Sequence, residues 1–271
     1  MGIPLEDTAA DILSKAQRGL GISDSQLAEQ AGIDAERVRR LRDGHLDSEI
    51  ISAVAPVLRL DGPALIKLAE NRWEPADVEP IDGLAQYNTV YADMTVNAYL
   101  LWDPASREAV VFDTGADCSE MLDRIKRERL TVKLILLTHS HPDHVADLSR
   151  LRKETGAPAY ISRRESANDV AGIDEGERFK CGALRIEARL TSGHSAGGIT
   201  FVVEGLSSLV AVVGDSLFAG SMGGGAVSYE DALQNNLQKI LTLPDETIVC
   251  PGHGPLTTVG KEKRENPFFA G

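Results

Sequence analysis

The segment Thr138-His-Ser-His-Pro-Asp-His144 follows directly after the apolar run Leu134–Leu137, which predicts a buried strand. Its first two histidines, His139 and His141, are two residues apart in extended backbone, so both rings can point to the same side. The proline stiffens the following turn, where a helix is expected to begin, so the aspartate and the third histidine can converge beside the first pair. We therefore expect four side chains with metal-binding groups to meet at one end of a strand.

Three more candidate ligands, His194, Asp215 and His253, lie in turns at the ends of predicted strands, where α/β folds place reactive groups. Asp113 also follows a predicted strand; it is a candidate to hold a ligand by a hydrogen bond, although turn chemistry explains it equally well. Imidazole and carboxylate groups suit Zn²⁺, Fe and Mn, and a catalytic site needs an open position for water. The seven candidate ligands, enough for two metal ions, are His139, His141, Asp143, His144, His194, Asp215 and His253.

From Tyr91 onward, short β-rich runs alternate with amphipathic helical segments, so we expect an α/β domain over residues 91–271. The predicted strands are Thr95–Trp102, Ala109–Phe112, Val132–Leu137, Ala159–Ile161, Leu184–Leu190, Ile199–Val203, Leu209–Val213 and Thr247–Cys250. The predicted helices are Cys118–Leu130, Asp143–Thr155 and Tyr229–Leu241.

Residues 1–75 are predicted to form a separate all-α domain of five short helices. Glycines separate segments in which Ala and Leu recur at helical spacing, such as Ser25–Ala31, Asp34–Arg42 and Pro63–Glu70. Residues 76–90 contain prolines and acids without periodicity, so we interpret them as a linker or lead-in to the second domain.

Composition excludes several classes of protein. With 271 residues, 42% hydrophobic and 25% charged, the chain has the make-up of a globular protein and not of a fibrous or disordered one. The three cysteines are far apart, which argues against a disulfide framework. The N-terminus carries no export signal and no apolar run is long enough to span a bilayer, so we expect a cytoplasmic protein without membrane contact.

The order of the histidine motifs resembles the metallo-β-lactamase superfamily. His-x-His-x-Asp-His after a strand is followed by Gly-His, Gly-Asp-Ser-Leu-Phe and Pro-Gly-His-Gly-Pro, and the resemblance covers about Tyr91 to Gly271. Within it, residues 214–221 and 251–268 are similar to the glyoxalase II-like branch, which includes thioester hydrolases and persulfide dioxygenases. The implied fold is an αββα sandwich with its site at one edge. The implied ligand sets are His139, His141 and His194 for one ion, Asp143, His144 and His253 for a second, and Asp215 as the bridge.

This resemblance implies a metallohydrolase that cleaves a thioester or related acyl bond of a small molecule. Two divalent ions, with Zn favoured and Fe or Mn as alternatives, would lower the pKa of a bound water and supply hydroxide for attack on a carbonyl. Asp143 could also orient the nucleophile and shuttle a proton, a catalytic role.

Two features distinguish the chain from glyoxalase II. The chain stops soon after His253, without the C-terminal helical domain that helps to grip glutathione, and Ser221-Met-Gly-Gly-Gly-Ala-Val lacks the Gly-Arg pattern of that branch. An alternative is therefore a persulfide dioxygenase with a single iron on His139, His194 and Asp215.

The N-terminal segment Ser23–Gly44 resembles the helix-turn-helix of phage repressors, which raises a third possibility, a DNA-binding regulator with a metal-site sensor domain. Against this, the chain has a net charge of −13, and residues 1–75 hold 13 acids against 9 Lys and Arg. Pairs such as Glu36 with Arg39 would also form an ordinary solvated face. Homodimerisation through these helices is a further expectation. The candidate DNA-contacting residues are Arg37, Arg39, Arg40 and Arg42.

Overall fold

The computed structural model describes residues 2–270, and its N-terminal part consists of five short helices, as the glycine-punctuated sequence predicts. Each helix begins after a Thr, Ser or Asp whose side chain accepts a hydrogen bond from the first turn, where amide groups otherwise lack partners. Their apolar sides share a core around Ile12, Leu58 and Leu65. The helices are α1 (Ala9–Gly19), α2 (Asp24–Ala31), α3 (Ala35–Arg42), α4 (Ser48–Val54) and α5 (Gly62–Ala69).

Two six-stranded sheets form the centre of the remaining chain. The first contains, in spatial order, β1 (Leu84–Tyr91), β2 (Met94–Trp102), β3 (Glu108–Phe112), β4 (Thr131–Leu136), β5 (Ala159–Ser162) and β6 (Ala171–Ile173). The second contains β14 (Thr257–Thr258), β13 (Ile248–Pro251), β10 (Val210–Gly214), β9 (Ile199–Glu204), β8 (Leu184–Leu190) and β7 (Arg178–Cys181). Strands β3 to β6 run parallel, as do β10 and β13, and the other pairs are antiparallel. A small hairpin, β11 (Leu217–Phe218) with β12 (Ser221–Met222), follows β10.

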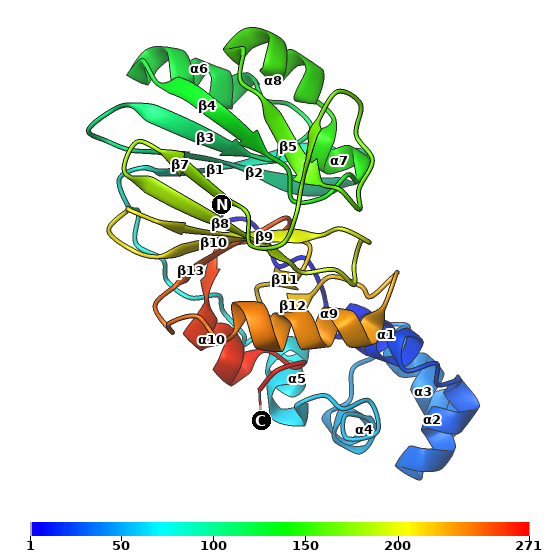
Figure 1. The fold of residues 1–271 in the computed structure, drawn as a ribbon. Helices are drawn as coiled ribbons and strands as arrows, with labels where there is room; N and C mark the ends of the chain where they lie inside the picture. The colour runs from blue at the N-terminus through cyan, green and yellow to red at the C-terminus, as the bar shows by residue number, and fades with distance from the viewer. Residues whose placement is uncertain (1, 271) are drawn as a thin grey trace.

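Helices cover the outer faces of both sheets and complete four layers (Figure 1). They are α6 (Ser119–Glu128), α7 (Pro142–Val145) and α8 (Leu148–Thr155) by the first sheet, and α9 (Tyr229–Asn235), its π-helical continuation Asn236–Ile240 and α10 (Val259–Glu265) by the second. The core between the sheets includes Phe112 and Phe201, whose ring centroids are 5.5 Å apart. Strands such as β3 and β10 are buried on both faces, which explains their uninterrupted apolar sequences. The predicted αββα sandwich is observed.

Two sequence-based boundaries differ from the structure. Strand β1 begins at Leu84, inside the segment 76–90 that the sequence predicts as a linker or lead-in, and ends at Tyr91. It is an edge strand in which buried side chains alternate with polar ones, so it lacks the apolar run that marks the inner strands. The predicted helix Asp143–Thr155 is divided into α7 and α8, because the N–H of Asp147 donates to Thr114 Oγ1 at the break.

The five helices pack against the C-terminal part of the chain. Trp73, at the end of this unit, is buried with Ala219 and donates from Nε1 to the carbonyl oxygen of Glu265 over 2.8 Å. Lys67 on α5 forms an ion pair with the side chain of Glu265. The N–H of Asp61 donates to the carbonyl oxygen of Pro267 over 2.8 Å. These contacts fix the helical unit beside the hairpin β11–β12 (Figure 1).

The structure also bears on the predictions about membranes and cysteines. None of the helices in residues 2–270 is long and apolar enough to span a bilayer. Within the same residues Cys118, Cys181 and Cys250 are buried and free of disulfides. Burial raises the pKa of each thiol, so the cysteines are poorly suited to act as nucleophiles.

A buried carboxyl group joins α10 to the hairpin. Glu262 is fully buried and accepts hydrogen bonds from the Gly220 N–H (2.9 Å), Asn266 Nδ2 (2.8 Å) and Thr257 Oγ1 (2.6 Å). Burial raises the pKa of Glu262 to about 7, against the opposing effect of these donors. Between pH 4.5 and about 7 the folded protein retains a proton that the unfolded chain, with an ordinary pKa of 4.5, has already lost.

We predict that Glu262 makes the free energy of unfolding fall as the pH rises from 4.5 to 7, by up to about 3 kcal/mol. Glu262→Gln can keep the same partners, since the Thr257 hydroxyl can reverse its direction, but it cannot titrate. Urea denaturation across this pH range should therefore show the variant gaining stability relative to the wild type. The exposed Glu246→Gln is the control. Parallel pH profiles for wild type and Glu262→Gln would contradict the prediction.

Candidate metal centre

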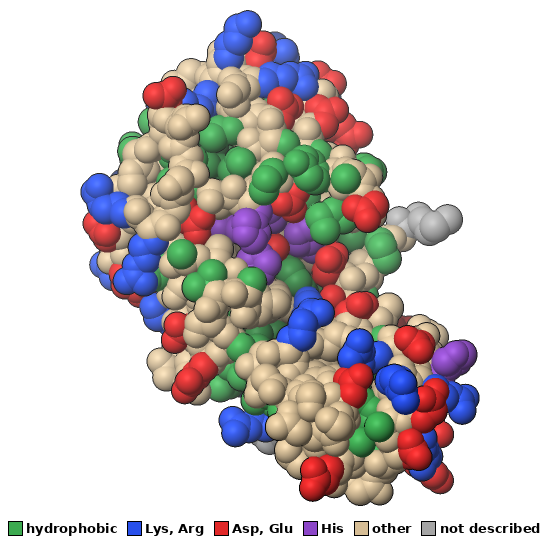
Figure 2. All heavy atoms as spheres, turned by 90° about the vertical axis from the view of Figure 1, so that its right-hand side faces the viewer, with side chains coloured by type: hydrophobic (Ala, Val, Ile, Leu, Met, Phe, Trp, Pro, Cys, Tyr) green, Lys and Arg blue, Asp and Glu red, His purple; other side chains and the backbone are tan. Residues whose placement is uncertain are grey.

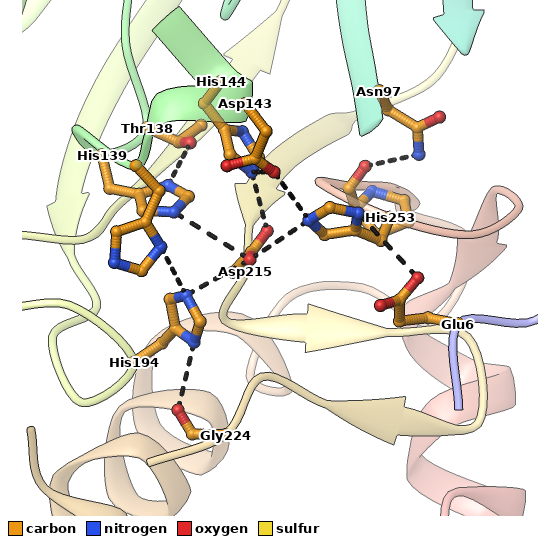
Figure 3. Close-up of polar contacts among 12 residues, drawn as sticks. Glu6, Asn97, Thr138, His139, Asp143, His144, His194, Asp215, Gly224 and His253 are labelled. Carbon is orange, nitrogen blue, oxygen red and sulfur yellow. Dashed lines mark hydrogen bonds and ion pairs between the residues drawn. The ribbon is translucent and has the colours of Figure 1, made fainter. Parts of the chain in front are cut away.

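Seven predicted ligands meet where β4, β8, β10 and β13 end. His139 and His141 lie in the loop after β4, and His194 lies in the loop after β8. Asp215 directly follows β10, and His253 follows β13. The other two, Asp143 and His144, belong to α7 and point toward the same centre (Figure 3).

The ligand atoms form two groups. His139, His141, His194 and Asp215 each offer one atom within 4.8 Å of the others, and Asp143, His144 and His253 do the same. Asp215 connects the groups, because one of its oxygens, Oδ2, lies 3.3 Å from His194 Nε2 and 3.4 Å from His253 Nε2. Its other oxygen lies 3.2 Å from His144 Nε2. This carboxylate is therefore in position to contact ions in both groups.

Outward hydrogen bonds fix which ring nitrogen each histidine turns to the centre. The Nδ1 atoms of His139, His144, His194 and His253 lie 2.6–3.1 Å from oxygens of Thr138, Asp113, Gly224 and Thr95, respectively. With Nδ1 donating to oxygen, each Nε2 carries a lone pair that faces inward.

Several buried polar atoms at this centre have no hydrogen-bond partner among residues 2–270, which indicates whether the residues suit a metal ion. His139 Nε2, His144 Nε2 and Asp215 Oδ1 are buried and have no hydrogen-bond partner within the described chain. The last two are 3.2 Å apart, yet their geometry does not form a hydrogen bond. Leaving such groups unsatisfied is costly, whereas a cation at the centre satisfies all of them. The donor set and its orientation therefore fit one or more divalent metal ions.

The ionisation of the buried carboxyl and imidazole groups also indicates that the centre requires cations. Burial opposes ionisation of Asp215, but His144 and His253 hold the pKa of its carboxyl well below the ordinary value. Burial likewise opposes protonation of His144, yet Asp215 and Asp113 raise its pKa to about 10. Burial lowers the pKa of His139, which has weaker compensation from carboxylates. Without metal, protons on histidines balance the buried carboxylates, and a divalent cation would replace them.

Comparison with known proteins agrees with this geometry. A family model described as the metallo-beta-lactamase superfamily matches residues 92–253. The chain belongs to the metallo-β-lactamase superfamily. The hydroxyacylglutathione hydrolase GloC of Haemophilus influenzae is 32% identical over 198 residues, which cover 64% of this chain and 92% of that protein.

Two solved structures are similar to this one. The BLEG-1 B3 metallo-β-lactamase has a TM-score of 0.60 and 30% identity, and the match covers 69% of this chain and all of that one. ETHE1 from Myxococcus xanthus has a TM-score of 0.60 and 26% identity, with 68% of this chain and 83% of that one covered.

Several buried residues hold the loops of the candidate metal centre in place, and sequence analysis missed most of them. The Asn97 amide donates to the carbonyl oxygens of Pro251 and Gly254 over 2.9 and 2.8 Å, so it holds both sides of the His253 loop. Asn97 is a buried polar residue within an apolar strand, a signal that could have revealed it. Glu165 contacts Ser140 and accepts from the Gly197 N–H, so it ties together two ligand loops. No local pattern marks Glu165, because its partners are distant in sequence.

The predicted DNA-contacting arginines lie on α3, away from the metal centre. Three of them form ion pairs: Arg37 with Asp47 (3.8 Å), Arg39 with Glu36 (2.7 Å) and Arg42 with Asp24 (2.8 Å). Arg40 is exposed. Helices α2 and α3 are joined at Gly32, which adopts a left-handed conformation with φ of 67°.

Asp113 has the positioning role that its sequence context left open. Its carboxylate accepts from the N–H and hydroxyl of Thr138, both over 2.7 Å, and from His144 Nδ1 over 2.9 Å. It thereby orients one ligand and the start of the loop that carries two others. Its φ of 56° is in the left-handed region, where Asn is also tolerated.

We predict that Asp113→Asn lowers metal affinity by about 10 to 100-fold, because the amide no longer fixes the His144 ring as a carboxylate does. Competition with a chromogenic chelator measures this change. Asp117→Asn, at an exposed position in the same loop, is the matched control. If folded Asp113→Asn protein bound metal as tightly as the wild type, the contact between Asp113 and His144 would not contribute to metal affinity.

Proposed function

We propose that this protein is a metallohydrolase of the glyoxalase II-like type that cleaves a thioester or related acyl bond. The observation that carries the proposal is the convergence of seven ligand side chains, divided into two groups by one shared carboxylate. We assign His139, His141 and His194 to one divalent ion, Asp143, His144 and His253 to a second, and Asp215 to both.

Bound divalent ions would supply Lewis acidity and a hydroxide nucleophile at neutral pH. The protein's own contribution is to hold the substrate and to move protons. His141 and His194 are the partly exposed candidate ligands, the His194 side chain by 20%, so the reacting carbonyl is expected to approach beside them. Asp143 Oδ2 lies 3.3 Å from His253 Nε2. We assign Asp143 the proposed role of orienting the attacking water and receiving its proton.

The thioester assignment is supported by the 32% identity to a protein named as a hydroxyacylglutathione hydrolase. A thiolate is also a better leaving group than an amine, whose departure requires full protonation. Because the BLEG-1 β-lactamase shares 30% identity, a β-lactam is the appropriate comparison substrate.

We predict that metal-loaded wild-type protein hydrolyses S-D-lactoylglutathione, and that His139→Ala or Asp215→Ala lowers kcat/KM by about a thousandfold or more and reduces bound metal. Release of thiol, followed with a thiol-reactive dye, and metal analysis of the same samples provide the two readouts. His45→Ala is the matched control, since His45 is an exposed histidine in the turn after α3.

Undiminished turnover in a folded, metal-free His139→Ala protein would contradict the proposed mechanism. Faster hydrolysis of a β-lactam than of any thioester would instead overturn the proposed substrate class.

A mononuclear iron dioxygenase acting on persulfides is the second candidate. It is favoured by one observation, that His139, His194 and Asp215 belong to a group that is complete without Asp143, His144 and His253. This alternative requires oxygen consumption with glutathione persulfide and a single iron per chain, neither of which the hydrolase requires.

We also infer that residues 1–75 form a helix-turn-helix-like domain around α2 and α3, in a chain that works in the cytoplasm. Arg37, Arg39 and Arg42 each form an ion pair with an acid of the helical unit, which favours an ordinary solvated face for this surface. We therefore do not assign DNA binding or dimerisation to it.

A further inference from the structure

We propose that α1 and the loop of residues 224–226 form a subsite for a carboxylate on the thiol portion of the substrate, with Arg18 as its specificity-determining residue. This inference rests on the proposed hydrolase function. It assigns the helical unit a direct part in substrate recognition.

A cleft of about 230 Å³ runs between α1 and the loop that precedes α9. Lys15, Arg18 and Gly19 line it from the helical unit, and Gly224, Gly225 and Ala226 line it from the other side. The cleft adjoins the metal centre, because His194 Nδ1 lies 3.1 Å from the carbonyl oxygen of Gly224 (Figure 3). A substrate whose carbonyl reaches His194 can therefore extend its other end into this cleft.

The surface view shows the same relation. Histidine side chains lie in a hollow between the α/β part and the helical part, and Lys or Arg side chains of the helical part face them across it (Figure 2). The helical side of the hollow thus carries positive charge, with Asp and Glu side chains beside it, in a chain whose overall charge is −13. Local positive charge is notable here, because the overall field repels anions.

The two cations in the cleft have different roles. Lys15 forms an ion pair with Asp7, donates to the carbonyl oxygen of Met222 over 2.9 Å and lies 5.1 Å from the centroid of the Phe218 ring. Its charge is therefore compensated, and it mainly anchors α1 against the hairpin β11–β12. Arg18 is exposed and forms no ion pair within residues 2–270. A guanidinium group can bind a carboxylate through two parallel hydrogen bonds.

The opposite wall offers backbone donors. Among the described residues, the N–H groups of Gly224 and Gly225 donate no hydrogen bond. N–H groups without an internal partner can donate hydrogen bonds to an anion that enters the cleft. A Cβ at Gly225 would lie 2.4 Å from Tyr229 Cα, whereas one at Gly224 would meet no atom within 4 Å. The loop therefore packs tightly against α9 at Gly225 and presents open space at Gly224.

Together, Arg18 and these two glycines line one cleft, and Gly224 of its wall is in contact with His194, a ligand of the proposed metal centre. The group that they would bind is a carboxylate on the thiol part of the substrate, away from the acyl bond that is cleaved. A peptidic thiol with free carboxylates satisfies this requirement, and a neutral thiol does not.

The test compares two thioesters with the same lactoyl group, one on glutathione and one on the uncharged thiol N-acetylcysteamine. We predict that Arg18→Ala lowers the ratio of kcat/KM for the charged ester over the neutral ester at least about tenfold, mainly through KM, and that Arg18→Glu lowers it further. Arg40→Ala removes an exposed arginine of α3 and should retain the wild-type ratio. An unchanged ratio in both Arg18 variants would overturn the subsite.

Binding of unreactive S-methylglutathione to the metal-loaded enzyme, measured by calorimetry, separates this inference from the proposed function. If the wild type fails to hydrolyse either ester but Arg18→Ala weakens binding at least about tenfold, the subsite is supported and the hydrolase assignment fails. If the wild type hydrolyses both esters and Arg18→Ala alters neither binding nor the ratio, the hydrolase is supported and the subsite is wrong. Absence of both turnover and binding in the wild type would overturn both.

Discussion

The buried carboxylate of Asp215 is the group around which the rest of the site is built. It lies within 4 Å of four histidines, at 3.9, 3.2, 3.3 and 3.4 Å from His139, His144, His194 and His253. Taking this charge out of water is costly unless cations surround it, so it requires either protonated imidazoles or metal ions. Two glycines make the position possible. A Cβ at Gly214 would lie 2.5 Å from Thr138 Oγ1, and one at Gly252 would lie 2.1 Å from Asp215 Oδ1.

This constraint explains why ligands come from both sheets. Asp215 stands at the end of β10, in the second sheet, while the His139 loop and α7 follow β4 in the first. Packing of the two sheets brings these ends together, and Asp113 and Asn97 then fix the orientation of the loops by hydrogen bonds. The site is thus a consequence of the sandwich, and the hydrophobic core between the sheets supports its geometry.

The sequence was most informative where residue types are rare and closely spaced. Four candidate ligands within six positions could be recognised without a structure, and inner strands such as β3 and β10 were predicted because they are apolar on both faces. Edge strand β1 was missed because it has no apolar run: polar side chains such as Gln86 alternate with buried ones such as Tyr87. Glu165 acts through partners that are distant in the chain, and the contact of Lys15 with Met222 is also distant, so no local pattern could reveal these roles. For the same reason, the sequence did not predict that the helical unit packs beside the metal centre, since this packing depends on contacts between residues about 200 positions apart.

The central claim is that these side chains hold two divalent metal ions in one site. Elemental analysis of the desalted protein, with metal content expressed per chain, tests it most directly. The account predicts about two metal ions per chain in the wild type. A single iron per chain would contradict the dinuclear centre and favour the dioxygenase, and a fully folded protein that retains no metal after incubation with Zn²⁺, Fe²⁺ or Mn²⁺ would contradict the account itself.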